Sequence, residues 1–480
     1  MNSPATLIAE SSGTLQDLYG KLSRPEPDAS SRRDAGAFLA EQLRTVNEAD
    51  IDLPDSPEQL ERWSLRGNDR VGHDFQTYLQ ARKAGAPRRY FSCKAQALYF
   101  IGAVAPTKQV DGAWLFGLLH HWKDRRFGAL IHTYLEELGD GQPDKNHVLL
   151  FDKLLREHEC AQHDALPDRY YLQGTLQLAM GQQVAHFLPE IIGYNLGYEQ
   201  PPLHLLITAH ELNELGIDPY YFTLHITIDN ADSGHASQAR RAVLDNMPVI
   251  GDRDRFYRRV RRGYALNGLG AGPDEICADF DLDQQVLRIL QRKSRAGRHA
   301  HGDHCRVAGV PVSEWLRDEK RVAEFLDALQ KHGWLNPGEP AGNSRFWNLI
   351  EGERAEMFGV FNRYERQVIY DWLTRGSETA AEDDKAVSFR TRQRLWRRRS
   401  TAAGQPASTS PTSISVDHGH DGRHTDDIDH EDHLLKRRLA GLDEHATLDA
   451  LVPLLSPALH HSPAGLLATR LFRRHFSVHG

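Results

Sequence analysis

The chain has 480 residues, of which 40% are hydrophobic, and a formal net charge of -8. This length allows a sizeable core and roughly two or three domains. No run of about 18 apolar residues occurs, and the N-terminus lacks the basic start and apolar stretch of a signal peptide, so we expect a cytoplasmic protein without a membrane segment. The four cysteines lie far apart without a CxxC pair, which argues against a disulfide framework or a cysteine-rich zinc module.

Helical periodicity dominates the first half of the chain. Residues 1–89 are polar with helical patches and are predicted to form an N-terminal extension. From Tyr90 the hydrophobic density rises, and strand-like alternation is nearly absent. The segments predicted to be helical are 93–104, 112–119, 127–138, 147–158, 170–187, 203–215 and 220–247. This pattern predicts an all-α bundle over residues 90–250.

Three regions follow the predicted bundle. Residues 251–375 form a second helical region, and residues 376–433 shift to Ser, Thr, Pro, Asp and His, which is typical of a disordered linker. Residues 434–480 carry an apolar stripe and predict a C-terminal helical segment. The basic run 390–399 beside the linker is interpreted as a solvated tract, so we expect neither nucleic acid nor a membrane as a partner.

The segment from Tyr220 to His235 is the most informative part of the sequence. On a single helix each residue advances about 100°, so His225, Asp229 and Asp232 would fall within roughly 60° of one another, and His235 would lie about 80° to one side of His225. The neighbouring residues are apolar, so this edge is predicted to face the interior. Charged groups are rarely buried unless they are paired or bind a metal.

Two other helical segments supply further carboxylates and an imidazole. Glu136 and Glu137 end one predicted helix, and His147 begins the next helix after a Gly/Pro turn. Glu190 and Glu199 are embedded in an apolar run that contains aromatic and small residues. Carboxylates and imidazoles delivered from several helices of one bundle suit a dinuclear iron or manganese centre. These residues alone do not decide between Glu136 and Glu137, or between Glu190 and Glu199.

In this order the motifs resemble the heme-oxygenase-like diiron oxidases, also described as iron-containing redox enzymes. The resemblance covers about residues 90 to 250 and is most specific in Tyr-Phe-x-x-His-x-x-x-Asp, where the histidine is His225. It implies a heme-oxygenase-like helical bundle with two Fe ions and O2 as co-substrate. The ligands that it implies are Glu137, His147, Glu199, His225, Asp229 and a closing histidine. The family pattern puts that histidine three residues after the aspartate, where this chain has Asp232, so His235 is favoured and Asp232 is the alternative.

The resulting hypothesis is a non-heme diiron, O2-dependent oxidase or oxygenase of a small organic substrate. The resemblance implies N-oxygenation, or oxidative C–C cleavage of an amino acid, amine or fatty acid. The sequence indicates no electron donor and leaves the oligomeric state undecided, with a homodimer as one alternative. Two other hypotheses compete with this one: a non-catalytic helical binding or scaffold protein, and a mononuclear zinc hydrolase, which needs only three protein ligands and an activated water.

Overall fold

The computed structural model describes residues 14–161, 166–228, 234–352, 355–376 and 422–479. Helices form nearly all of the regular structure in these ranges, and the only strands there make a short antiparallel hairpin in which Val307 pairs with Val310. The predicted all-α class, with helical N- and C-terminal regions around the bundle, is thereby confirmed. Within the described residues, no helix combines the length and the apolar character needed to cross a bilayer.

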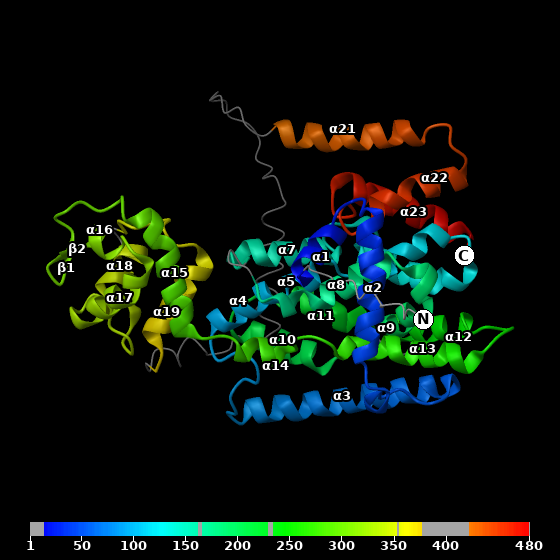
Figure 1. Ribbon diagram of the computed structural model, residues 1–480, viewed down its shortest axis with the longest axis horizontal. Helices are drawn as coiled ribbons and strands as arrows, with labels where there is room; N and C mark the ends of the chain where they lie inside the picture. The colour runs from blue at the N-terminus through cyan, green and yellow to red at the C-terminus, as the bar shows by residue number, and fades with distance from the viewer. Residues whose placement is uncertain (1–13, 162–165, 229–233, 353–354, 377–421, 480) are drawn as a thin grey trace, which may run out of the picture.

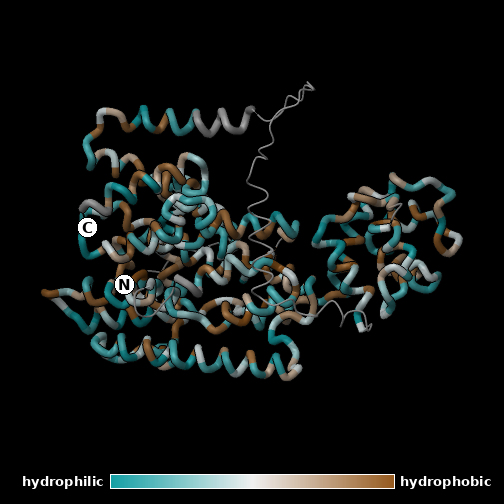
Figure 2. The backbone as a smooth tube through the Cα atoms, turned by 180° about the vertical axis from the view of Figure 1, so that it is seen from behind, coloured by the Kyte–Doolittle hydropathy of each residue, from teal (hydrophilic) through white to brown (hydrophobic). Residues whose placement is uncertain are grey.

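The helices form a large bundle and a smaller lobe beside it (Figure 1). Three N-terminal helices, α1 (Leu15–Leu22), α2 (Ala29–Thr45) and α3 (Leu60–Lys83), lie along the outside of the bundle. Of these, α3 buries only Leu60 and Ser64 and is mostly hydrophilic (Figure 2). The bundle itself contains α4 (Lys94–Ala103), α5 (Ala105–Lys108), η3 (Ala113–His121), α6 (Gly128–Glu137), η5 (Gly139–Gly141), α7 (His147–His158), η6 (Asp168–Tyr171), α8 (Leu172–Gly181), α9 (Val184–Tyr198), α10 (Leu203–Glu214), α11 (Tyr220–Ile228), α12 (His235–Asp245), α13 (Arg253–Ala265) and α14 (Pro273–Ala278).

The remaining elements form the lobe and a C-terminal segment. The lobe contains α15 (Leu282–Gly297), β1 (Arg306–Val307), β2 (Val310–Pro311), α16 (Val312–Trp315), α17 (Val322–Lys331), α18 (Arg345–Glu351) and α19 (Arg363–Thr374). The C-terminal segment contains α21 (Gly422–Leu439), α22 (Glu444–Leu451), η11 (Val452–Leu455) and α23 (Pro463–His479). Short 3-10 turns connect other elements: η1 (Glu48–Asp50), η2 (Pro57–Gln59), η4 (Arg125–Phe127), η7 (Leu266–Gly268), η8 (Glu319–Arg321) and η9 (Ala341–Asn343).

Several sequence predictions need correction. Residues 113–121 form a 3-10 helix, and the predicted helix 170–187 is divided among η6, α8 and the start of α9. The predicted helix 220–247 is two helices, because Gly234 adopts an extended conformation (φ -89°, ψ -165°) directly before α12. Helix α21 begins at Gly422, inside the predicted linker, whereas residues 377–421 lie outside the described part of the chain.

Two glycines allow the closest helix crossing of the bundle, between α9 and α13. A Cβ atom at Gly193 would overlap the carbonyl oxygen of Val260 on α13, and one at Gly263 would overlap the carbonyl oxygen of Glu190 on α9. The backbones therefore touch, so no larger residue fits at either position without moving a helix. Helix α13 is thus packed into the bundle, although it begins after residue 250, where the sequence analysis placed the bundle's end.

Helix α23 and η11 of the C-terminal segment pack against the bundle, whereas α21 lies farther out and contacts α23 (Figure 1). The Tyr134 hydroxyl on α6 donates to the carbonyl oxygen of Leu455 at 2.5 Å, and the Arg470 guanidinium on α23 donates to the carbonyl oxygen of Gly141 at 2.7 Å. Both contacts hold the end of α6 and the turn that follows it. The predicted C-terminal helical segment therefore forms part of the bundle surface.

We predict that Gly193→Ala destabilises the protein by about 3 kcal/mol or more, because the added methyl group must push α13 away from α9. The matched control is Gly72→Ala in the exposed interior of α3, where a Cβ atom would meet nothing within 4 Å. That change should stabilise by about 0.5–1 kcal/mol through helix propensity. Urea unfolding followed by circular dichroism measures both, and equal effects of the two changes would contradict the close crossing.

Candidate metal centre

Five of the predicted ligands converge in the bundle core and form two groups with one further residue. The atoms of each group that could bind a metal lie within 4.8 Å of one another, and all these side chains are buried. The first group consists of Asp111, Glu137, His147 and His225, and the second consists of Glu137, Glu199 and His235. Glu137 belongs to both groups. The two groups are therefore adjacent and share one carboxylate.

A tight turn between α6 and α7 brings Glu137 and His147 together. Gly139, Asp140 and Gly141 all have positive φ values (64°, 51° and 77°), which reverses the chain direction. Glycine tolerates this conformation at no steric cost, and Asp tolerates it better than most residues. Asn146 then caps α7, because its side chain accepts a hydrogen bond from Leu149 N at 3.1 Å. Glu137 therefore ends α6 and His147 begins α7, as predicted.

The two carboxylate oxygens of Glu137 face histidines of different groups. Oε2 lies 2.5 Å from His147 Nδ1, and Oε1 lies 3.8 Å from His235 Nδ1. A carboxylate that presents one oxygen to each of two sites has the arrangement expected of a bridging ligand. Glu137 is therefore the residue that connects the two groups.

The orientation of His225 is fixed by a backbone hydrogen bond. Its Nδ1–H donates to the carbonyl oxygen of Tyr221 at 2.8 Å, so in the neutral ring the Nε2 lone pair points into the first group. Nε2 lies 3.1 Å from Asp111 Oδ2. Burial, followed by the charge of His147, lowers the pKa of His225, so the ring is neutral at pH 7. Two lone pairs then face each other, which favours a cation between them.

Asp111 was missed in the sequence analysis. It lies in the turn between α5 and η3, and its side chain is completely buried. It accepts hydrogen bonds from the hydroxyl groups of Tyr198 (2.6 Å) and Tyr221 (2.8 Å), which fix both oxygens. The available signal was a single acid inside the apolar run from Val110 to Leu119. A charge in such a run must find a buried partner.

The second group is built around His235, the first residue of α12. Its Nδ1 lies 3.0 Å from Oε2 of Glu199, which caps the C-terminus of α9. Its Nε2 lies 2.7 Å from Oε2 of Glu136. Both ring nitrogens of His235 are therefore engaged by carboxylates from two different helices.

The structure distinguishes between the alternatives left open by the sequence. Glu137 lies inside both groups, whereas the Glu136 side chain is 30% exposed and contacts His235 from outside. Glu190 forms a two-pronged ion pair with Arg259, with both distances 2.7 Å, and lies outside both groups, whereas Glu199 lies within one. Asp229 and Asp232 fall outside the described residues. Because α11 and α12 are separate helices, the single-helix angles predicted for His225 and His235 were wrong, yet both side chains reach the centre.

The charges of the centre are strongly coupled. Burial alone would raise the pKa of Asp111, but the charge of Lys108, followed by the neighbouring His147, lowers it well below its usual range. Burial would likewise raise the pKa of Glu137, and the charge of His147 lowers it. Burial dominates at Glu199 and raises its pKa. Without metal, positively charged imidazolium groups thus compensate the charge of the buried carboxylates. Bound divalent cations would take over this role.

The residues present fit a pair of metal ions. His147 Nε2 and Glu199 Oε1 are buried without a hydrogen-bond partner, which is costly unless an ion satisfies them. The 3.0–3.1 Å spacings at His235–Glu199 and His225–Asp111 match two ligands about 2.1 Å from one ion at roughly a right angle. Oxygen and imidazole donors without thiolates suit iron or manganese.

The comparison with protein families agrees with this donor set. The family described as iron-containing redox enzyme matches residues 98–268. The suspected resemblance is thereby confirmed, and an iron-dependent oxidoreductase is supported. The match covers every residue of both groups. Searches of curated proteins and of solved structures found no match.

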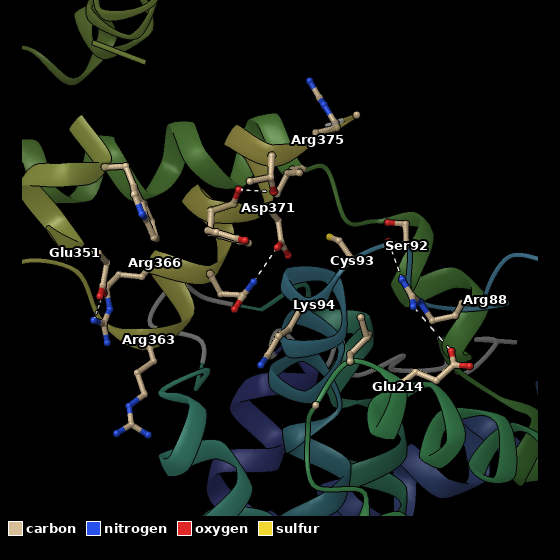
Figure 3. A pocket seen from close by; sticks show the side chains of 18 residues that line it. Arg88, Ser92, Cys93, Lys94, Glu214, Glu351, Arg363, Arg366, Asp371 and Arg375 are labelled. Carbon is tan, nitrogen blue, oxygen red and sulfur yellow. Dashed lines mark hydrogen bonds and ion pairs between the residues drawn. The ribbon is translucent and has the colours of Figure 1, made fainter. Parts of the chain in front are cut away.

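A different cavity lies where the bundle meets the lobe, and its lining includes none of the candidate ligands (Figure 3). It has a volume of about 880 Å³, and its charged residues largely satisfy one another. Arg366 pairs with Glu351, and Arg88 lies 3.9 Å from Glu214. Asp371 on α19 accepts a hydrogen bond from Ala95 N at 2.7 Å, at the start of α4. This last contact joins the lobe to the bundle.

Glu137→Gln should reduce metal binding at both groups, because an amide neither carries the charge nor bridges two ions through two anionic oxygens. We expect fewer than half of the wild-type ions per chain, counted by elemental analysis after anaerobic Fe(II) loading. The control is Glu190→Gln, which breaks the Arg259 ion pair and should lower stability while leaving the ion count unchanged. Equal ion counts in Glu137→Gln and the wild-type protein would contradict the shared-ligand geometry.

Metal loading should release protons. Burial alone would lower the pKa values of His147 and His235, but Glu137 and Glu199 raise them to about 10 and about 12. Both rings therefore hold an extra proton at neutral pH, which a metal must displace because only a free lone pair coordinates. We expect about two protons released per chain at pH 7 and an affinity that falls as the pH falls. Titration with zinc in weak buffer with a pH indicator measures the proton release. Zinc binding without proton release would contradict the protonated state of His147 and His235.

Proposed function

We propose that this protein is a non-heme diiron, O2-dependent oxidase or oxygenase of a small organic substrate. The observation that carries the proposal is Glu137, whose two carboxylate oxygens face histidines of two separate ligand groups. A mononuclear zinc site would need only three protein ligands, whereas six buried candidates are gathered here. The match of residues 98–268 to the iron-containing redox enzymes supports iron as the metal.

When bound, an iron pair supplies the redox chemistry, because it can bind O2 and donate electrons to it while a substrate is oxidised. The protein's part is to hold the ions and to orient their ligands. Asp111, Glu137, His147 and His225 would hold one ion, and Glu137, Glu199 and His235 would hold the other. Carboxylates tolerate changes of metal charge, and neutral imidazoles bind Fe(II) without adding charge.

Aromatic residues orient the first group and exclude water from it. The Tyr198 and Tyr221 hydroxyls fix Asp111, and Lys108 Nζ donates to the Tyr198 hydroxyl at 3.1 Å. The ammonium group of Lys108 also lies 5.4 Å from the Tyr198 ring centre and 5.8 Å from that of Tyr221. Burial, with Asp111 as the next contributor, raises the pKa of both tyrosines well above the usual value, so both hydroxyls keep their protons and stay donors. This network keeps the Asp111 oxygens in place.

The test is anaerobic Fe(II) loading of the full-length apo-protein, with iron counted per chain, followed by rapid mixing with O2. We expect about two irons per chain, as a ferritin-like carboxylate donor set would bind, and an absorbance change that depends on O2. His225→Ala should lose iron while keeping its helix content by circular dichroism. Zinc bound in preference to iron, with no response to O2, would favour the hydrolase hypothesis. No metal uptake would favour a scaffold with a buried polar network.

A further inference from the structure

The cavity between the bundle and the lobe lies apart from the candidate metal centre, and the proposed function does not use it (Figure 3). Its volume of about 880 Å³ is in the range of sites that hold small molecules and cofactors. The bundle borders it at the start of α4 and the end of α10, and the lobe borders it mainly with α18 and α19. A ligand held here would therefore contact both parts of the protein.

One face of helix α19 supplies most of the lobe's share of the lining. Its lining residues recur at alternating spacings of three and one, so they lie on the same side of the helix. The residues on this face are Arg363, Arg366, Gln367, Tyr370, Asp371 and Thr374. The other face of α19 is apolar and buried in the lobe. Helix α19 therefore presents two arginines and a tyrosine to the cavity.

Positive charge exceeds negative charge in the lining, which contains five cationic side chains and three carboxylates. Glu351 pairs with Arg366. Glu214 lies 2.7 Å from Arg82, which is outside the lining, and 3.9 Å from Arg88 within it. The carboxylates of the lining therefore leave a surplus of positive charge, which an anionic ligand would compensate.

Lys94 and Arg363 bring positive charge to the cavity from both parts of the protein. Lys94 begins α4 of the bundle, and Arg363 begins α19 of the lobe. Burial, followed by the charges of Lys94 and Arg363, lowers the pKa of His158 to about 4, so both cations lie on the side of the cavity next to this neutral ring. The Arg363 guanidinium donates to the carbonyl oxygen of Glu157 at 2.7 Å. Ammonium and guanidinium groups that act together are suited to bind phosphate.

Two aromatic rings of the lobe also line the cavity. Trp347 on α18 and Tyr370 on α19 are partly exposed, and their ring centres lie 5.5 Å apart with the planes inclined by 53°. Aromatic side chains of this kind stack on nucleobases. Tyr370 follows Arg363 by two helical turns, about 10 Å along α19. This separation is comparable to that between the base and the outer phosphates of a nucleotide.

We propose that this cavity binds a mononucleotide, with the base against Trp347 and Tyr370 and the phosphates on Lys94 and Arg363. A bare phosphate would leave the aromatic rings without a contact, and an uncharged nucleoside would leave the surplus positive charge uncompensated. The site is separate from the metal centre, so this inference does not rest on the proposed function. Because the nucleotide contacts both the bundle and the lobe, it stabilises their association.

The first test measures binding to the full-length protein by isothermal titration calorimetry. The probes are the ribonucleoside triphosphates, the nucleoside of the one that binds most tightly, inorganic tripolyphosphate and a short single strand of DNA. We expect at least one triphosphate to bind about tenfold more tightly than its nucleoside and than tripolyphosphate, because each fragment lacks one set of contacts. Equal affinity for either fragment, tighter binding of the DNA strand, or no binding of any triphosphate would overturn the proposal.

The second test uses variants of the two ends of the cavity. Arg363→Gln and Lys94→Gln should each weaken the binding of triphosphate and of tripolyphosphate about tenfold, the size of one lost charged hydrogen bond. Trp347→Leu should weaken triphosphate binding by a similar factor and leave tripolyphosphate binding unchanged. The control is Arg288→Gln, which changes an exposed arginine of α15 outside the lining.

Lys94 belongs to the bundle, so its variant keeps the test valid if Arg363→Gln loosens the lobe. Circular dichroism checks that each variant is folded. Unchanged triphosphate affinity in folded Lys94→Gln and Arg363→Gln variants would overturn the assigned phosphate position.

Glu137→Gln separates this inference from the proposed function, because a metal ion in the bundle core also attracts phosphate. We expect this variant to bind the triphosphate with wild-type affinity, although it holds less metal. Loss of triphosphate binding in Glu137→Gln, with unchanged binding in Lys94→Gln, would assign the phosphate to the metal centre and overturn the cavity site. Two irons per chain without triphosphate binding would overturn the cavity site and leave the diiron proposal intact.

Discussion

The structure depends on one constraint: three carboxylates and three imidazoles are buried together in the middle of an apolar bundle. The core forms two hydrophobic clusters, one that includes residues of α7 and α11 and one that includes residues of α6, α9 and α12. The first-group histidines come from α7 and α11, and the ligands found only in the second group come from α9 and α12. Glu137 on α6 joins the two. The polar centre therefore lies where the clusters meet, and burial of its charges is tolerated only if they compensate one another.

The surrounding fold is arranged to keep these groups from relaxing. Residues of the left-handed region reverse the chain after Glu137, and the glycine crossing of α9 with α13 fixes the helix that ends at Glu199. The tyrosine hydroxyls hold Asp111, and a backbone carbonyl sets the His225 ring. Such outer contacts commonly decide metal affinity as much as the ligands do. Rigidity around the centre is therefore a consequence of backbone geometry at a few positions.

Much of the fold and of the site could be predicted from local sequence signals. The Gly/Pro turn and the helical periodicity that follows it placed His147 correctly at a helix start, and Glu137, Glu199, His225 and His235 all reach the centre. Asp111 was not predictable by periodicity, because it lies in a turn and its partners are distant in sequence. The helix break at Gly234 was missed because residues 229–234, which are mostly polar and small as in turns, were interpreted as metal ligands on one continuous helix. Ion pairing of Glu190 with Arg259 is a tertiary contact that no local pattern reveals.

The C-terminal segment shows why a family match does not describe the whole site. His460 is buried, and burial lowers its pKa to about 3, so it stays neutral and its Nδ1 accepts from Asn146 Nδ2 at 3.1 Å. Asn146 in turn caps the helix that begins with His147. Arg470 on α23 also donates a hydrogen bond to the carbonyl oxygen of Gly141. The two contacts connect the C-terminal segment to the turn between Glu137 and His147. Helix α23 also contributes Arg473 and Phe476 to a cavity that Glu136 lines from α6. The matched region thus holds the candidate metal ligands, while a segment outside it supports their geometry.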